Sequence, residues 1–196
     1  MSVGAVSVRR FQWRGEEGVV TSPFLIEDSR IGLLWDHWQS SLRPGRLPRR
    51  EEIDPTAIKD ALGITWIYRL DDSGRDFYCA LAGDEIMSAW GKPGMIGMPL
   101  SQMFPLSAYE TLRARWLEVL DRPAVMHGSA RYNQHWAETP MKDRPERLSL
   151  PLDGPDGRPY GVIGATSYRQ PEAAETDANT LRLLPPRVVG IDELFD

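Results

Sequence analysis

The hydrophobic positions over residues 77–82 recur with a period of two. Phe77, Cys79 and Leu81 share one face of this pattern, as expected of a strand whose two faces have different neighbours. After a glycine, Ile86 and Trp90 lie four residues apart, on one side of a short predicted helix. A strand that leads into a short helix can form the floor and wall of a small-molecule pocket. Residues 76–104 are therefore predicted to form the central part of the domain.

A longer apolar stripe with helical spacing precedes this region. The pair Ser22-Pro23 is typical of a helix start, and Arg43-Pro44-Gly45 of a helix end. The stripe between them either packs on the sheet of its own domain or forms a dimerisation or partner-docking surface. The resulting interface candidates are Ile31, Leu34, Trp35, Trp38 and Leu42.

Further helices are predicted from their capping signals. Asp54-Pro55 starts a short helix that ends at Gly63. Ser107 with Glu110 forms a capping box that opens a helix through Leu120. Strands are predicted at 64–70 and 76–82, which form a hairpin, and later at 125–132, 146–152 and 160–168.

This order predicts an α+β fold, with a five-stranded antiparallel sheet, helices on one face, and an N-terminal amphipathic helix. We expect a loose arm or isolated strand at 1–21, N-terminal helices at 22–62, a core at 63–170 and a tail at 171–196. The tail is apolar near its end, so we expect it to pack on the domain or on a partner.

Composition narrows the functional classes. The chain has 196 residues, a net charge of -5 and one cysteine, Cys79. An acidic chain is a poor match for nucleic acid as the main partner, although residues 43–50 are basic. No apolar run approaches the roughly 20 residues of a membrane span, and no signal peptide is evident. These features predict a cytoplasmic protein.

The common short signatures of catalysis and metal binding are missing from the sequence. Its histidines are His37, His127 and His135, and none has the paired spacing of a metal site. We expect His37 at the surface or an interface, His135 in a polar linker at 133–145, and His127 in a strand of the sheet.

The resemblance to a known family rests on several motifs in a fixed order. Residues 31–168 resemble a proteobacterial PAS family often found as single-domain proteins. The motifs are Gly45-Arg46-Leu47-Pro48-Arg49, Asp54-Pro55, Ala80-Leu81-Ala82-Gly83, Gly91 to Gly97, and Pro151-Leu152. Ala80 stands where the family commonly has arginine.

The resemblance implies a sensory or interaction module in signal transduction, which binds a small ligand or a protein partner without catalysis. In PAS relatives that bind flavin or haem, the reactive cysteine lies in a short helix and the histidine in the long helix. Cys79 lies in a predicted strand and the long helix has no histidine, so we expect neither cofactor, and no metal. The expected pocket residues are Trp66, Tyr68, Phe77, Cys79, Leu81, Ile86, Trp90, Phe104, Leu112, Trp116 and His127.

Two alternatives stay open. One is a small isomerase or hydrolase in which His127 works with Asp84 or Glu85 in the cavity. The other is a structural adaptor that associates through the tryptophans of the N-terminal helix, for instance as a homodimer.

Overall fold

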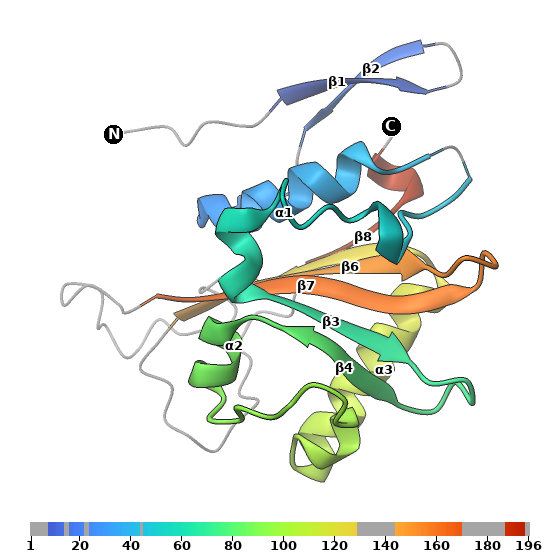
Figure 1. The fold of residues 1–196 in the computed structure, drawn as a ribbon. Coiled ribbons are helices and arrows are strands. Elements are labelled where there is room, and N and C mark those ends of the chain that lie inside the picture. Colours follow the sequence, from blue (N-terminus) through green and yellow to red (C-terminus); the bar gives the residue numbers. More distant parts are fainter. Residues whose placement is uncertain are drawn as a thin grey trace, which may run out of the picture.

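The computed structural model describes residues 8–13, 16–21, 24–43, 45–128, 144–169 and 187–194. Its centre is a six-stranded antiparallel sheet in the order β4-β3-β7-β6-β5-β8 (Figure 1). The strands are β3 (Thr65–Leu70), β4 (Phe77–Ala82), β5 (Ala124–Gly128), β6 (Arg144–Asp153), β7 (Pro159–Arg169) and β8 (Arg187–Gly190).

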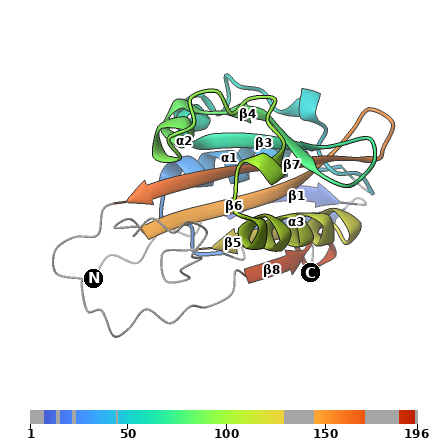
Figure 2. The same ribbon diagram turned by 90° about the horizontal axis from the view of Figure 1, so that it is seen from below.

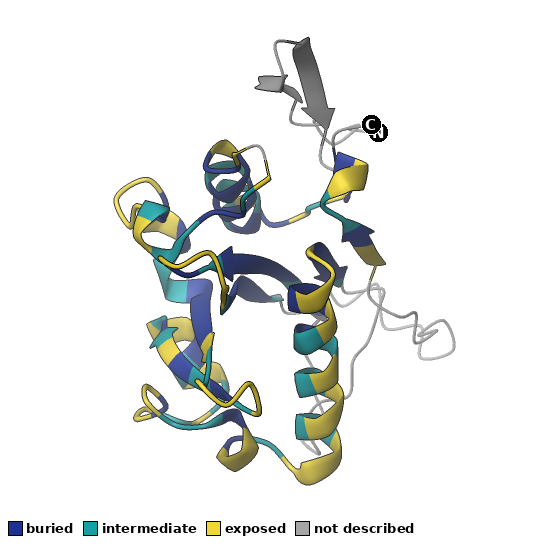
Figure 3. Ribbon diagram, turned by 90° about the vertical axis from the view of Figure 1, so that its right-hand side faces the viewer, coloured by how far each residue is buried: buried dark blue, intermediate teal, exposed yellow. Residues whose placement is uncertain are grey.

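Helices cover both faces of this sheet. Helix α1 (Ser29–Ser40) lies on one face, and α2 (Asp84–Ala89) and α3 (Leu106–Asp121) lie on the other (Figures 1 and 2). The buried side of each helix faces the sheet and the exposed side faces away from it (Figure 3). The α+β class is confirmed, and among the described residues no helix is long and apolar enough to cross a membrane.

The sheet has one strand more than predicted because the chain returns to it near the C-terminus. Strand β8 pairs with β5, and Ile191 donates its backbone N–H to the Pro123 carbonyl at 2.9 Å. Val189 and Leu194 are buried in the core on the α1 side. The described part of the tail, which includes the 3-10 turn η5 (Asp192–Leu194), therefore packs on the domain.

Helix α1 packs on the sheet of its own domain. All five interface candidates of the apolar stripe are at most 2% exposed. The Trp38 indole also donates to the Pro151 carbonyl of β6 at 2.9 Å. The second face of the sheet is apolar and needs cover, so these side chains are not available for dimerisation or docking. The prediction of an interface at Ile31, Leu34, Trp35, Trp38 and Leu42 is wrong.

Three local predictions need correction. Helix α1 begins after Asp28, whose carboxylate accepts from the Arg30 N–H, and the expected start at Ser22-Pro23 lies outside the described residues. The helix expected after Asp54-Pro55 is a turn followed by the 3-10 helix η2 (Lys59–Ile64). Helix α3 begins after Pro105 with no side-chain cap, so the capping box at Ser107 does not set its start.

The structure of η2 has a tertiary cause. A Cβ atom added to Gly83 would lie 2.2 Å from the carbonyl oxygens of Leu62 and Gly63. The backbone of η2 therefore packs directly on the end of β4, and this close approach overrides local helix propensity. Another 3-10 helix, η1 (Arg50–Glu52), lies in the preceding connector.

The N-terminal arm forms a hairpin instead of a loose segment. Strands β1 (Val8–Trp13) and β2 (Glu16–Thr21) pair antiparallel, with Phe11 opposite Gly18. They form a separate two-stranded sheet that is not part of the six-stranded one. In Figure 1 this hairpin lies beyond α1, on the side away from α3.

Candidate functional site

The space between α3 and the sheet is an aromatic compartment centred on Trp116. Its ring centroid lies 5.2 Å from that of Trp66, 4.9 Å from Tyr68 and 5.3 Å from Phe77. All four side chains are buried. Strands β3 and β4 thus supply the floor of the compartment, and α3 supplies its wall.

Most polar atoms in this compartment have a partner. Trp66 Nε1 donates to Thr166 Oγ1 at 3.0 Å, and the Tyr68 hydroxyl contacts Met103 Sδ at 3.4 Å. Trp116 Nε1 is different: it is buried and has no hydrogen-bond acceptor among the described residues. Met103 and Thr166 are not among the predicted pocket residues, although the alternation along β7 could have indicated Thr166.

The compartment has a neutral interior. Burial raises the pKa of the Tyr68 hydroxyl far above its usual value. Burial also raises the pKa of the Cys79 thiol. Both groups therefore stay protonated near neutral pH, and Cys79 is not a reactive thiolate.

The margin of the compartment is formed by partly buried side chains. Trp90 donates from Nε1 to the Tyr168 hydroxyl at 2.5 Å, and its ring packs edge-on against Phe104 with centroids 5.1 Å apart. Leu112 lies at the same margin, while Ile86 of α2 is fully buried. These four predicted pocket residues therefore gather around the aromatic compartment.

The prediction that Leu81 lines the pocket is wrong. The register between β3 and β4 shifts, because Ile67 lies opposite Leu81 while the next residue, Tyr68, lies opposite Cys79. The extra residue, Ala80, forms a bulge and reverses the facing of the strand beyond it. Leu81 consequently packs on the α1 side of the sheet, away from Phe77 and Cys79.

The prediction that His127 lines the pocket is also wrong. It lies on the α1 side of the sheet, where its ring packs on Phe24 with centroids 5.1 Å apart and Nε2 lies 3.0 Å from Glu146 Oε1. Glu85 instead binds Arg30 at 2.8 Å. The geometry that the enzyme hypothesis required, His127 in an open pocket beside Asp84 or Glu85, is not present in the described structure.

A family model described as PAS domain matches residues 28–167. The chain belongs to the PAS domain family. A search of curated proteins finds no match. The aromatic compartment of this PAS domain is thus enclosed by the family's sheet and its connecting helices.

In the basic connector of the PAS domain, Arg46 pairs with a carboxylate and Arg43 bonds to backbone carbonyls. Arg46 binds Glu52 through two hydrogen bonds of 2.7 Å. The side-chain hydrogen bonds from Arg46 lower the pKa of Glu52 to about 2. Arg43 donates to the carbonyls of Ser40 and Leu42. These contacts favour a structural connector over a phosphate site.

The other two histidines are His37 and His135. His37 accepts the backbone N–H of Asp54 through Nε2 at 2.9 Å and so joins α1 to the connector. His135 lies outside the described residues, as does the linker at 133–143. The described residues contain no group of three or more histidine, cysteine or carboxylate side chains placed to hold a metal ion.

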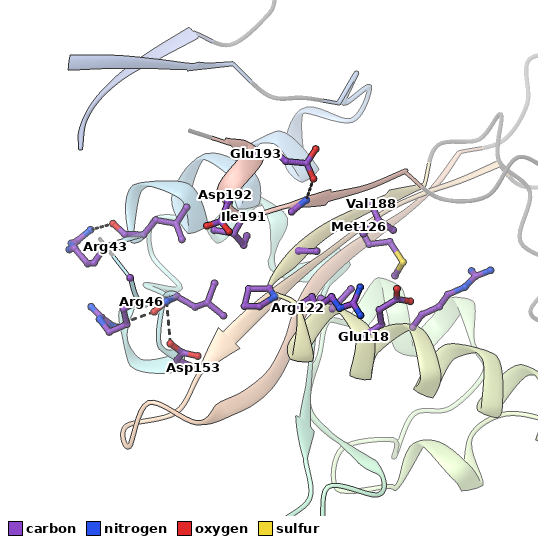
Figure 4. Close-up of a pocket in the computed structure, with 18 residues that line it drawn as sticks. Arg43, Arg46, Glu118, Arg122, Met126, Asp153, Val188, Ile191, Asp192 and Glu193 are labelled. Atoms are coloured by element: carbon purple, nitrogen blue, oxygen red, sulfur yellow. Dashed lines mark hydrogen bonds between the residues drawn. The ribbon is translucent and has the colours of Figure 1, made fainter. Parts of the chain in front are cut away.

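A second feature of the PAS domain is a groove of about 1040 Å³ between α3 and the C-terminal strand (Figure 4). Its apolar lining includes Val119, Met126 and Val188. Arg122 and Glu118 lie on the α3 wall, and Asp192 and Glu193 lie on the opposite wall (Figure 4). We refer to it as the α3–β8 groove. No sequence pattern indicated it, because its walls are distant in the chain.

Proposed function

We propose that this PAS domain is a sensory module without a catalytic role, and that its input is a small, neutral, planar ligand bound in the aromatic compartment. The observation that carries the proposal is the buried Trp116 indole N–H, which has no acceptor among the described residues. Leaving such a donor unsatisfied costs about 1–3 kcal/mol. A ligand that presents an acceptor to Trp116 Nε1 recovers this energy.

The chemistry of the compartment limits the ligand class. Three aromatic rings surround Trp116 within 5.3 Å, and stacked or edge-on packing suits a flat molecule. Tyr68 and Cys79 are neutral, so a buried charge on the ligand has no partner from them. The ligand is therefore a heteroaromatic or carbonyl compound.

The four rings of the compartment are almost fully buried, so ligand entry requires movement of the wall. Trp90 and Phe104 at the margin are only partly buried, which makes the segment from α2 to α3 the part that rearranges. Arg30 of α1 binds Glu85 of α2 at 2.8 Å. A shift of α2 is therefore passed to α1, and the ligand acts by favouring one arrangement of these helices.

The experiment compares two probes of similar shape. Quinoline has a ring nitrogen that accepts a hydrogen bond, while naphthalene has none. We expect quinoline to raise the melting temperature of the wild-type protein more than naphthalene does, and the difference to vanish in Trp116→Phe. The proposal fails if neither probe binds, or if Trp116→Phe keeps the preference for quinoline.

A further inference from the structure

Helix α2 buries little of its surface. Ile86 is its buried side chain, and four of its six residues are exposed. Gly91, just after the helix, has a φ of 60°, and a Cβ atom added there has no neighbour within 4 Å. Glycine adopts this left-handed conformation without strain. Trp90 therefore lies between a helix with little buried surface and a point at which the backbone can turn.

A side-chain hydrogen bond ties the end of α2 to the sheet. Trp90 Nε1 donates to the hydroxyl of Tyr168 on β7 at 2.5 Å. Both side chains are only partly buried and pack against the buried cluster that contains Trp116. The Trp90 ring also packs edge-on against Phe104. We refer to this hydrogen bond as the Trp90–Tyr168 latch.

On the sheet side, the latch adjoins the floor of the aromatic compartment. Tyr168 follows Thr166 by two residues along β7 and so lies on the same face of the strand. Thr166 accepts the indole N–H of Trp66 at 3.0 Å. Burial is the main cause of the raised pKa of Tyr68, and the neighbouring Tyr168 hydroxyl contributes to it. The latch therefore joins α2 to the strand face that lines the compartment.

We propose that the Trp90–Tyr168 latch is the gate of the aromatic compartment, which opens when the hydrogen bond breaks and Trp90 turns away about Gly91. The ligand itself rests on the proposed function, to which the gate adds the control of access. A hydrogen bond between groups that water can also reach favours the closed state by roughly two- to tenfold. Because the latch forms again over a bound ligand, it slows entry and exit alike and leaves the dissociation constant nearly unchanged.

The first test needs no ligand. The Trp116 indole N–H is buried, so its hydrogen exchanges with heavy water when the compartment opens. Trp90→Phe and Tyr168→Phe each remove the latch and keep an aromatic ring. We expect each variant to speed this exchange by about two- to tenfold in nitrogen-15 spectra. The double variant should add little, since both changes break the same bond.

Two controls separate the gate from a general loss of stability. The Trp38 indole N–H, on the opposite side of the sheet, is bonded to the Pro151 carbonyl and should exchange at the wild-type rate in every variant. Tyr109→Phe removes a hydroxyl from another partly buried tyrosine at the same cluster and should leave both exchange rates unchanged. The gate is contradicted if the latch variants do not speed exchange at Trp116, or if they speed it equally at Trp38.

The second test measures ligand kinetics by stopped-flow fluorescence. The latch variants should bind and release quinoline about two- to tenfold faster than wild type, with a dissociation constant within about twofold of the wild-type value. A changed dissociation constant with unchanged rates overturns the gate. If quinoline does not bind, the proposed function fails, whereas the exchange measurements still decide whether the latch controls access to the compartment.

Discussion

The Glu146 carboxylate lies 3.0 Å from Nε2 of His127, and both side chains are buried. The same carboxylate accepts the backbone N–H groups of Glu27 and Asp28 at 2.9 and 2.8 Å. One side chain of β6 therefore joins β5 to the segment that leads into α1. His127 has a structural role here, and this role accounts for its burial.

Replacing this carboxylate is expected to loosen the start of α1. In Glu146→Gln the amide keeps the shape but loses the charge and one acceptor, so a buried N–H or the His127 ring loses its partner. We expect the free energy of unfolding to fall by about 2–4 kcal/mol in urea titrations. Hydrogen exchange should also rise over residues 24–34. Glu110→Gln on the exposed side of α3 is the control. An equal loss of stability in this variant would show that the contacts of Glu146 have no specific stabilising role.

Asp28 makes the stability depend on acid pH. Burial alone raises its pKa, but hydrogen bonds from Arg30 and Ser167 outweigh burial and lower the pKa from 3.8 to about 2. A carboxylate with a depressed folded-state pKa stabilises the protein above its unfolded value, and this contribution is lost as the pH falls from about 4 through 2. We expect Asp28→Asn to be less stable than wild type at pH 6, and the gap to narrow towards pH 2. A stability difference between wild type and Asp28→Asn that stays constant from pH 6 to pH 2 contradicts the lowered pKa of Asp28.

Gly83 and Gly63 are expected to respond differently to alanine. A Cβ atom at Gly83 meets backbone oxygens at 2.2 Å, which cannot move without displacing η2. At Gly63 the nearest atom is the Glu85 side-chain oxygen at 2.7 Å, at the flexible end of a side chain. Thermal unfolding should show a loss of about 3 kcal/mol or more for Gly83→Ala and under about 1 kcal/mol for Gly63→Ala. Similar losses at both sites are inconsistent with this packing.

Comparing substitutions at Trp38 and Trp35 distinguishes the contribution of a hydrogen bond from that of packing in the α1 core. Trp38→Phe removes the donor to the Pro151 carbonyl and leaves that buried oxygen without it. Trp35→Phe removes similar volume from the same cluster. Chemical denaturation should show Trp38→Phe to be the less stable variant by about 1–2 kcal/mol. Equal stability of the two variants would show that the hydrogen bond contributes nothing.

Much of the fold was predictable because its elements carry strong local signals. The apolar stripe of α1, the hairpin β3–β4 and the helix after Phe104 all follow from periodicity and turn residues. Part of the aromatic wall was predictable for the same reason, since Phe77 and Trp116 lie on elements with a clear apolar period. The facing of Trp66 was not, because the strand at 64–70 is apolar on both faces.

The predictions that were wrong failed because they depend on tertiary contacts. A one-residue bulge at Ala80 cannot be read from alternation, yet it moves Leu81 to the opposite face. His127 follows Met126 in β5, and only the pairing with β6 shows that the two residues face opposite sides. The sixth strand depends on contacts between Val189 and a core assembled from distant segments. Contacts between distant segments cannot be predicted from the local sequence.

The central claim, that the aromatic compartment binds a ligand which accepts the Trp116 N–H, is tested most directly by nuclear magnetic resonance. The Trp116 indole signal in a nitrogen-15 spectrum is assigned by its loss in Trp116→Phe. Titration with quinoline should move this signal to lower field as the new hydrogen bond forms, while naphthalene leaves it close to its starting position. An indole signal that does not move, while quinoline binds elsewhere on the protein or not at all, contradicts the account.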